Sequence, residues 1–202
     1  MMAGREVTAG PMIKGVPLEK FLEWYASRHG AEAARAVVDR LPPDLKAQLD
    51  AGSRGFGVLA NAWYPAALVH HLLDDMAQEL SPRERGELVE GATEAIVRSS
   101  LRGVYKILFQ LFMNPTRYAA RAQTLWDRYY DSGLVEKRIV APTVHESRIE
   151  DWKSHHPLLC QMNAESARII YEELGCARVQ VERLACVSRG DDACALRIAW
   201  AG

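Results

Sequence analysis

The hydrophobic period of the chain changes near residue 133, and this change limits most strongly what the chain can fold into. Before it, apolar residues such as Leu18, Phe21 and Leu22 recur at the three- and four-residue spacing of a helix. After it, the segments 177–187 (ARVQVERLACV) and 193–200 (ACALRIAW) alternate as strands do. The order predicts an α+β fold, with an N-terminal helical layer packed on a small antiparallel sheet that ends in a C-terminal β-hairpin.

Turn and capping signals divide the chain further. We expect residues 1–14 to form a tail and residues 15–202 a single α+β domain, mainly helical over 15–131 and strand, helix and hairpin over 132–202. The sequence Ser81-Pro82-x-Glu84 is a capping box that begins the longest predicted helix. Apolar residues continue as far as Phe112, so we expect that helix to run through to there with a buried C-terminal part.

Composition excludes several classes of protein. The chain has 202 residues, of which 49% are hydrophobic, with 25 basic against 26 acidic side chains. This balance provides no bulk positive field for nucleic acid. The chain shows neither a signal peptide nor an apolar run long enough to span a membrane. We therefore expect a cytoplasmic protein with reduced cysteines.

Three of the four cysteines are predicted to meet. Cys186 and Cys194 lie on the two arms of the terminal hairpin, and Cys160 lies one turn inside the helix before it. Three thiolates form most of a tetrahedral zinc site, for which Glu182 or His156 is the candidate fourth ligand. The alternative is that these thiols are ordinary core residues.

The C-terminal stretch HHPLLCQMNAESARIIYEELGCARVQVERLACVSRGDDACALRIAW resembles the 4-vinyl-reductase-like domain, a small-ligand-binding module of bacterial and archaeal regulators. The resemblance implies that the three cysteines hold a structural zinc together with a glutamate. The family places that glutamate three residues before its middle cysteine, where this chain has Arg183. Three alternatives follow from this difference. A β-bulge turns Glu182 toward the site, His156 takes the place of the glutamate, or the site holds no metal.

The resemblance extends in fold to the haem nitric-oxide-binding domains and to the TRAPP-type vesicle-tethering subunits. Their helical layer encloses an apolar pocket or tunnel. A haem site in such a fold needs an axial histidine on a helix and a Tyr-x-Ser-x-Arg element for the propionates. The chain has no Tyr-x-Ser-x-Arg sequence, so we expect no haem.

Aromatic residues are concentrated in the helical part of the chain. Some are expected to line a cavity for an apolar or aromatic ligand, although the same residues also serve as core filling. The predicted lining residues are Trp126, Tyr130, Tyr105, Phe109 and Trp63.

Together these features predict a non-enzymatic ligand-binding, sensory or protein-interaction domain. A small apolar molecule would shift the population of helix packings, which a partner signalling protein reads, and the chain would form a homodimer through its helical layer. The alternatives are a ligand-free scaffold, an accessory reductase, or a metal-dependent hydrolase. The hydrolase would use the acids and histidines of one helix, His70, His71, Asp74, Asp75 and Glu79.

Overall fold

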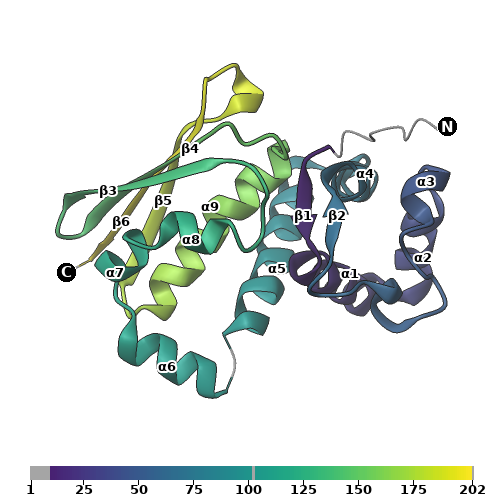
Figure 1. The fold of residues 1–202 in the computed structure, drawn as a ribbon, viewed down its shortest axis with the longest axis horizontal. Coiled ribbons are helices and arrows are strands. Elements are labelled where there is room, and N and C mark those ends of the chain that lie inside the picture. The colour runs from purple at the N-terminus through teal and green to yellow at the C-terminus, as the bar shows by residue number, and fades with distance from the viewer. Residues whose placement is uncertain (1–9, 102, 202) are drawn as a thin grey trace, which may run out of the picture.

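A computed structural model describes residues 10–101 and 103–201, apart from the side chains of residues 104 and 105. The predicted α+β class is confirmed. Helices fill the N-terminal part, and the chain ends in a hairpin of β5 (Ala177–Ala185) and β6 (Cys194–Ala201). Figure 1 shows the sheet on one side of the molecule and the first four helices on the other.

The helices follow the capping and stop signals of the sequence. The Ser81 hydroxyl accepts the backbone N–H of Glu84 while the Glu84 carboxylate accepts the N–H of Ser81, and this capping box begins α5. Gly30, with a φ of +94°, ends α1. The helices are α1 (Gly15–His29), α2 (Ala31–Asp39), α3 (Pro43–Lys46), α4 (Ala66–Ala77), α5 (Pro82–Ser100), α6 (Val104–Phe112), α7 (Pro115–Ala119), α8 (Ala122–Trp126) and α9 (Pro157–Glu173).

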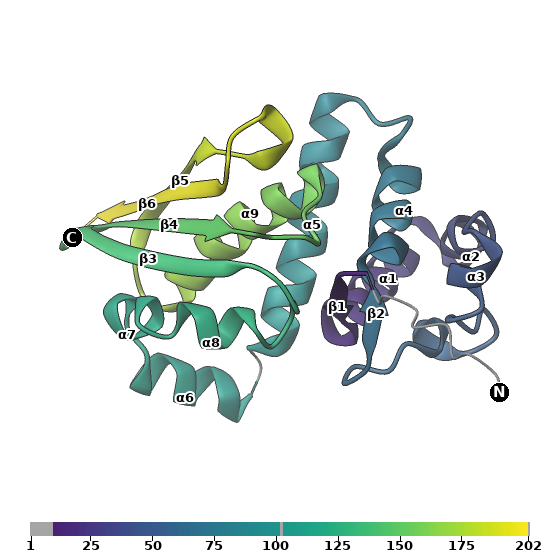
Figure 2. The ribbon, with the colours of Figure 1, turned by 45° about the horizontal axis from the view of Figure 1, so that its top comes forward.

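The main sheet has the strand order β3-β4-β6-β5, and every neighbouring pair is antiparallel. The two strands not yet given are β3 (Leu134–Ala141) and β4 (Val144–Glu150). Alternate residues point to the helices, and Ile149, Leu196 and Ile198 are buried on that face. Figure 2 shows α9 behind this sheet, with α7 and α8 below it.

Helix α5 joins the sheet half of the molecule to the N-terminal half, because it packs on both α9 and α1. The N-terminal half also holds a two-stranded sheet of β1 (Met12–Lys14) and β2 (Trp63–Pro65). A single core cluster runs through both halves and includes Leu22, Leu72 and Cys160.

The expectation of one continuous helix from Pro82 to Phe112 is wrong. Gly103 adopts a φ of +57° between α5 and α6, and the chain changes direction there. Helix α6 is amphipathic, but Leu111 and Phe112 are 69% and 62% exposed rather than buried. A single glycine inside an apolar run is compatible with a continuous helix, so the pattern alone does not predict this break.

The predicted tail is also corrected in part. Residues 1–9 lie outside the described part of the chain, but Met12–Lys14 forms β1, and Ile13 is 3% exposed. The sequence did not predict β1 and β2, because strands of three residues have too few positions to show an alternating pattern. It did not predict β4 either, because that segment contains many polar residues. Among the described residues, no helix has the length and hydropathy required to cross a membrane.

Candidate functional site

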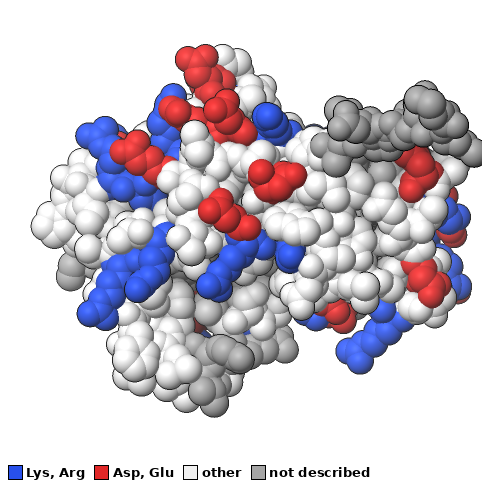
Figure 3. Space-filling view, viewed as in Figure 1, with Lys and Arg blue, Asp and Glu red and all other residues white. Residues whose placement is uncertain are grey.

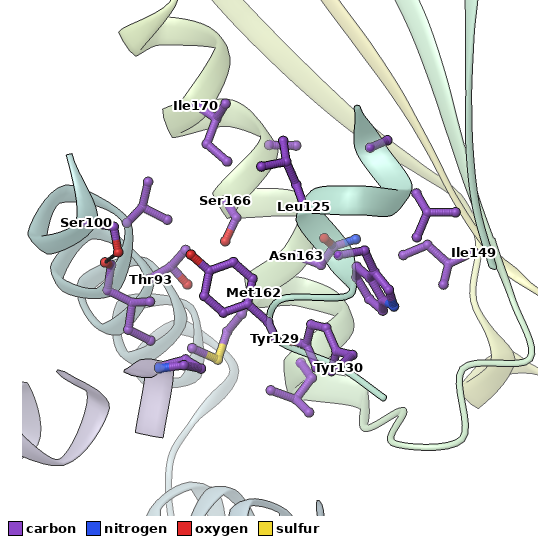
Figure 4. Close-up of a pocket in the computed structure, with 18 of the residues that line it drawn as sticks. Thr93, Ser100, Leu125, Tyr129, Tyr130, Ile149, Met162, Asn163, Ser166 and Ile170 are labelled. Carbon is purple, nitrogen blue, oxygen red and sulfur yellow. Dashed lines mark hydrogen bonds between the residues drawn. The ribbon is translucent and has the colours of Figure 1, made fainter. Parts of the chain in front are cut away.

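An apolar pocket of about 360 Å³ lies between the helical layer and the sheet. Helix α5 contributes Thr93 and Ile96 to its wall, α9 contributes Met162 and Ser166, and β4 contributes Ile149. Figure 4 shows the α5 and α9 side chains pointing toward one another across the space. The pocket has the size and the apolar character of a small-molecule site.

Two aromatic side chains form one wall of the pocket. The rings of Trp126 and Tyr130 are stacked with centroids 4.2 Å apart. The Trp126 indole N–H donates to the Ser132 carbonyl over 2.8 Å, which fixes the orientation of its ring. Burial raises the pKa of the Tyr130 phenol, so this wall stays uncharged.

The predicted ligand-binding residues are distributed as follows. Trp126, Tyr130 and Phe109 line the pocket. Trp63 lies elsewhere, half-exposed on β2 with the Lys14 ammonium 4.4 Å from its ring centroid. The side chain of Tyr105 lies outside the described residues.

Polar side chains interrupt the apolar lining at a few points. Thr93 is 1% exposed, and its hydroxyl has no hydrogen-bond partner among the described residues. Lys137 reaches the pocket from β3, and burial lowers its pKa to about 7. Sequence patterns did not identify either residue, because neither lies in a recognisable motif.

The three predicted cysteines meet beside the start of α9. The Cys186 Sγ lies 3.4 Å from the Cys160 Sγ and 3.9 Å from the Cys194 Sγ, and all three residues are buried. The fourth member of the group is His155, whose Nε2 lies 3.5 Å from the Cys186 Sγ. All four ligand atoms lie within 4.8 Å of one another.

The distances in this group match those of a tetrahedral zinc site. With Zn–S bonds of about 2.3 Å, two sulfur ligands are about 3.8 Å apart, and a sulfur and a nitrogen ligand about 3.5 Å. The observed separations of 3.4, 3.9 and 3.5 Å lie close to those values. Interaction with the neighbouring Cys160 thiol lowers the pKa of the Cys194 thiol, which favours a thiolate at this position.

Neither of the two fourth ligands considered from sequence belongs to this group. The Glu182 carboxylate is 67% exposed and faces Arg197 across the hairpin, at 3.8 Å. His156 caps α9 by accepting the N–H of Leu158, while its Nε2 lies 3.0 Å from Asp74. The adjacent His155 takes the position instead. The sequence shows the pair of histidines but not which one faces the thiols.

Three of the five side chains proposed for a hydrolase are engaged in structural contacts. His70 interacts with the Ser154 carbonyl at 3.1 Å, Asp74 with His156, and Asp75 with Arg40 at 2.7 Å. In the described part of the chain, the cysteine and His155 group is the one cluster of potential metal ligands.

The fold is that of H-NOX proteins. An H-NOX protein from S. oneidensis in the Fe(II)NO ligation state superimposes with a TM-score of 0.68 at 13% identity, covering 94% of this chain and 99% of that one. An Fe(II) unliganded H-NOX protein from K. algicida gives 0.65 at 11% identity, covering 94% and 97%. No family model and no curated protein matches the sequence.

These neighbours contradict the expectation that no haem is bound. Similar structures include one from a study of haem distortion in the H-NOX family, with a TM-score of 0.58 at 8% identity. The expectation rested on the missing Tyr-x-Ser-x-Arg sequence, and a motif is a poor test at such low identity. The resemblance to the 4-vinyl-reductase-like domain stays a prediction. The expected similarity in fold to the haem nitric-oxide-binding domains is supported.

Proposed function

We propose that this chain is a non-enzymatic sensory domain whose pocket binds a small molecule between the helices and the sheet. The observation that carries the proposal is the pocket of about 360 Å³, walled by α5, α8, α9 and the sheet. An apolar pocket of this size provides many dispersion contacts to an apolar molecule of matching shape. The H-NOX fold of the neighbouring structures supports the same function.

Haem is one ligand that the fold suggests. In the described lining, the side chains able to bind iron are Tyr118, Tyr129, Tyr130, Met162 and Lys137, and neither histidine nor cysteine is present. These residues do not fit a histidine-ligated haem, and tyrosine is the ligand type with precedent among them. We therefore include haemin among the ligands to be tested and assign it no step.

The signal is proposed to leave the pocket through α6. Phe109 lines the pocket, whereas Ile107, Leu111 and Phe112 of the same helix are exposed. Figure 3 shows an uncharged area at the lower left, where α6 lies. A cluster of exposed apolar side chains is typical of a protein contact, and a ligand that moves Phe109 moves this surface.

The homodimer is part of the same proposal, with a second copy of the chain on the α6 surface. The variant Leu111→Glu places a charge on that surface, and it is expected to reduce the molar mass measured by light scattering from dimer to monomer. Leu184→Glu, at a half-exposed position on β5, is the control. A monomeric wild-type protein would rule out this contact.

A structural zinc ion at Cys160, Cys186, Cys194 and His155 is a second proposal. The closed set of three thiolates and one imidazole is typical of a structural site, because it leaves no position for substrate. The four cysteines are free thiols, which agrees with the reducing cytoplasmic location that we propose. One zinc per chain is expected by elemental analysis of protein purified without chelator.

Ligand binding is tested by thermal shift across a panel of aliphatic, aromatic and haemin ligands. Ser166 faces the pocket from α9, and Ser166→Phe fills part of it. The variant is expected to weaken binding at least tenfold, whereas Ser27→Phe, on the exposed face of α1, leaves it unchanged. If no compound binds the wild-type protein, or if Ser166→Phe binds equally well, the pocket is not a ligand site.

A further inference from the structure

Lys137 is the one charged residue among the described side chains that line the pocket. It lies in the middle of β3, opposite Ser147 of β4, on the face of the sheet that the helices cover. Every other described lining residue is apolar, aromatic or a neutral polar residue. A ligand in this pocket therefore meets a single positive charge.

Two aromatic rings lie next to this ammonium, and no acid of the described residues pairs with it. Its Nζ lies 4.3 Å from the ring centroid of Tyr118 and 5.3 Å from that of Tyr171. The Tyr171 hydroxyl in turn interacts with the buried His145 Nδ1 at 2.7 Å. Among the described residues, Lys137 takes part in no ion pair and in no side-chain hydrogen bond, and no carboxylate oxygen lies within 4 Å of its Nζ.

Lys137 is partly exposed, so its ammonium has lost part of the hydration that it has in bulk water. Cation–π contact with two tyrosine rings offsets part of this loss, but no acceptor among the described residues takes a hydrogen bond from its three N–H donors. Charged groups that have lost hydration are normally paired in proteins. A negatively charged acceptor would pair with the Lys137 ammonium, and a ligand in the pocket can supply it.

We propose that the ligand of the pocket is an amphiphilic carboxylic acid, whose apolar body lies among the aliphatic and aromatic side chains and whose carboxylate pairs with Lys137. This assignment rests on the proposed ligand-binding function and specifies its chemistry. The Thr93 hydroxyl on the α5 wall supports it independently, because it is a second polar atom of this pocket that has no hydrogen-bond partner among the described residues.

The test compares decanoic acid with decan-1-ol by isothermal titration, since the two share an apolar chain and differ in charge. Wild-type protein is expected to bind the acid at least tenfold more tightly. Lys137→Met keeps most of the length of the side chain and removes the charge, so it is expected to abolish this preference while retaining alcohol binding. Lys46→Met, on α3 and away from the pocket, is the control.

A second measurement avoids the risk that Lys137→Met fails to fold. In wild-type protein, acid binding is expected to weaken as the pH rises from about 7 to about 10, because Lys137 loses its proton, and alcohol binding is expected to stay constant. His145, Tyr118 and Tyr171 face the same group, and burial lowers the pKa of His145 but raises those of the two phenols. These three groups therefore stay neutral over that interval.

The outcomes separate this assignment from the function on which it rests. Equal affinity of acid and alcohol for the wild-type protein, or a preference that persists in Lys137→Met, overturns the carboxylate assignment and leaves the pocket in place. Absence of binding by both compounds, and by the rest of the ligand panel, overturns the assignment together with the proposed function.

Discussion

The indole ring of Trp152 lies edge-on to the imidazole of His155, with ring centroids 5.2 Å apart and planes at 88°. Trp152 also packs against Trp126 and Tyr130, at centroid distances of 5.0 and 5.4 Å. Those two rings form the aromatic wall of the pocket. The proposed zinc site and the ligand site thus both contact one buried aromatic ring, and we expect a change at one site to affect the other.

Loss of the metal is therefore expected to weaken ligand binding. Cys160→Ser removes a buried thiol from the group with His155, whereas Cys176→Ser changes a cysteine outside it. We expect Cys160→Ser to lose zinc in elemental analysis, to shift tryptophan fluorescence, and to reduce ligand affinity, with Cys176→Ser unchanged in all three. Equal zinc content in the two variants would contradict the metal site.

Part of the cysteine site, and of the helix layer beside it, was predictable from the sequence. A hairpin brings its two arms together, so Cys186 and Cys194 were expected to meet, and the capping box at Ser81 set the start of α5. These features depend on local geometry. The choice of His155 over His156 depends on rotation about one backbone position before α9, and sequence spacing does not resolve that.

The pocket itself was less predictable. Trp126, Tyr130 and Phe109 were identified as aromatic residues of the helical part, but the sequence cannot tell a lining residue from a filling residue. The break at Gly103 turns α6 away from the continuation of α5, and Lys137 appears in the sequence as an ordinary strand lysine. Both depend on packing between segments that are distant along the chain.

Gly133 supports the aromatic wall, and alanine at this position is expected to disturb it. Gly133 has a φ of +106°, and a Cβ there would lie 2.9 Å from the Trp126 Nε1. Gly190 has a φ of +90° with open space around it, so Gly190→Ala carries the backbone strain alone. We expect Gly133→Ala to lower the free energy of unfolding by about 2 kcal/mol, and Gly190→Ala by about 1 kcal/mol.

Chemical denaturation of both variants measures this difference, and ligand titration extends it. Gly133→Ala is also expected to weaken ligand binding, because the Trp126 ring must move. Equal losses of unfolding free energy in the two variants would show that the Trp126 ring moves without an energetic cost. That result would contradict the role given to Gly133.

The stability of the protein is expected to rise with pH above neutrality because of Lys137. Its pKa is about 7 in the folded state, against 10.5 as the ordinary value, and burial is the cause. Between those pH values the unfolded chain holds a proton that the folded chain has released, so raising the pH favours folding. Below about 7 both states are protonated, and the cost of burying the charge is at its full value.

Lys137→Met removes this dependence. The difference in unfolding free energy between wild-type and variant proteins, measured with urea at about pH 6.5 and about pH 9.5, is expected to shift in favour of the wild type at the higher pH. A difference that stays constant would mean that the ammonium is well solvated, and it would remove one support of the carboxylate assignment.

Glu173 holds α6 against the rest of the domain. Its carboxylate, 10% exposed, pairs with Arg98 of α5 and Lys106 of α6, each at 2.8 Å. Glu173→Gln leaves two cations around a neutral amide, and we expect faster amide hydrogen exchange throughout α6 with little change in α4. Glu87→Gln, which breaks an exposed pair with Arg83, is the control. Equal exchange rates of α6 in both variants would show that the Glu173 ion pairs do not hold this helix in place.

The most direct test of the central claim is a crystal structure of the protein grown with the tightest-binding compound of the panel. The account predicts electron density for that compound between α5 and α9, in contact with the Trp126 and Phe109 side chains. Density for the compound outside this space, or side chains that close the pocket completely, would contradict the proposal that the domain senses a small molecule.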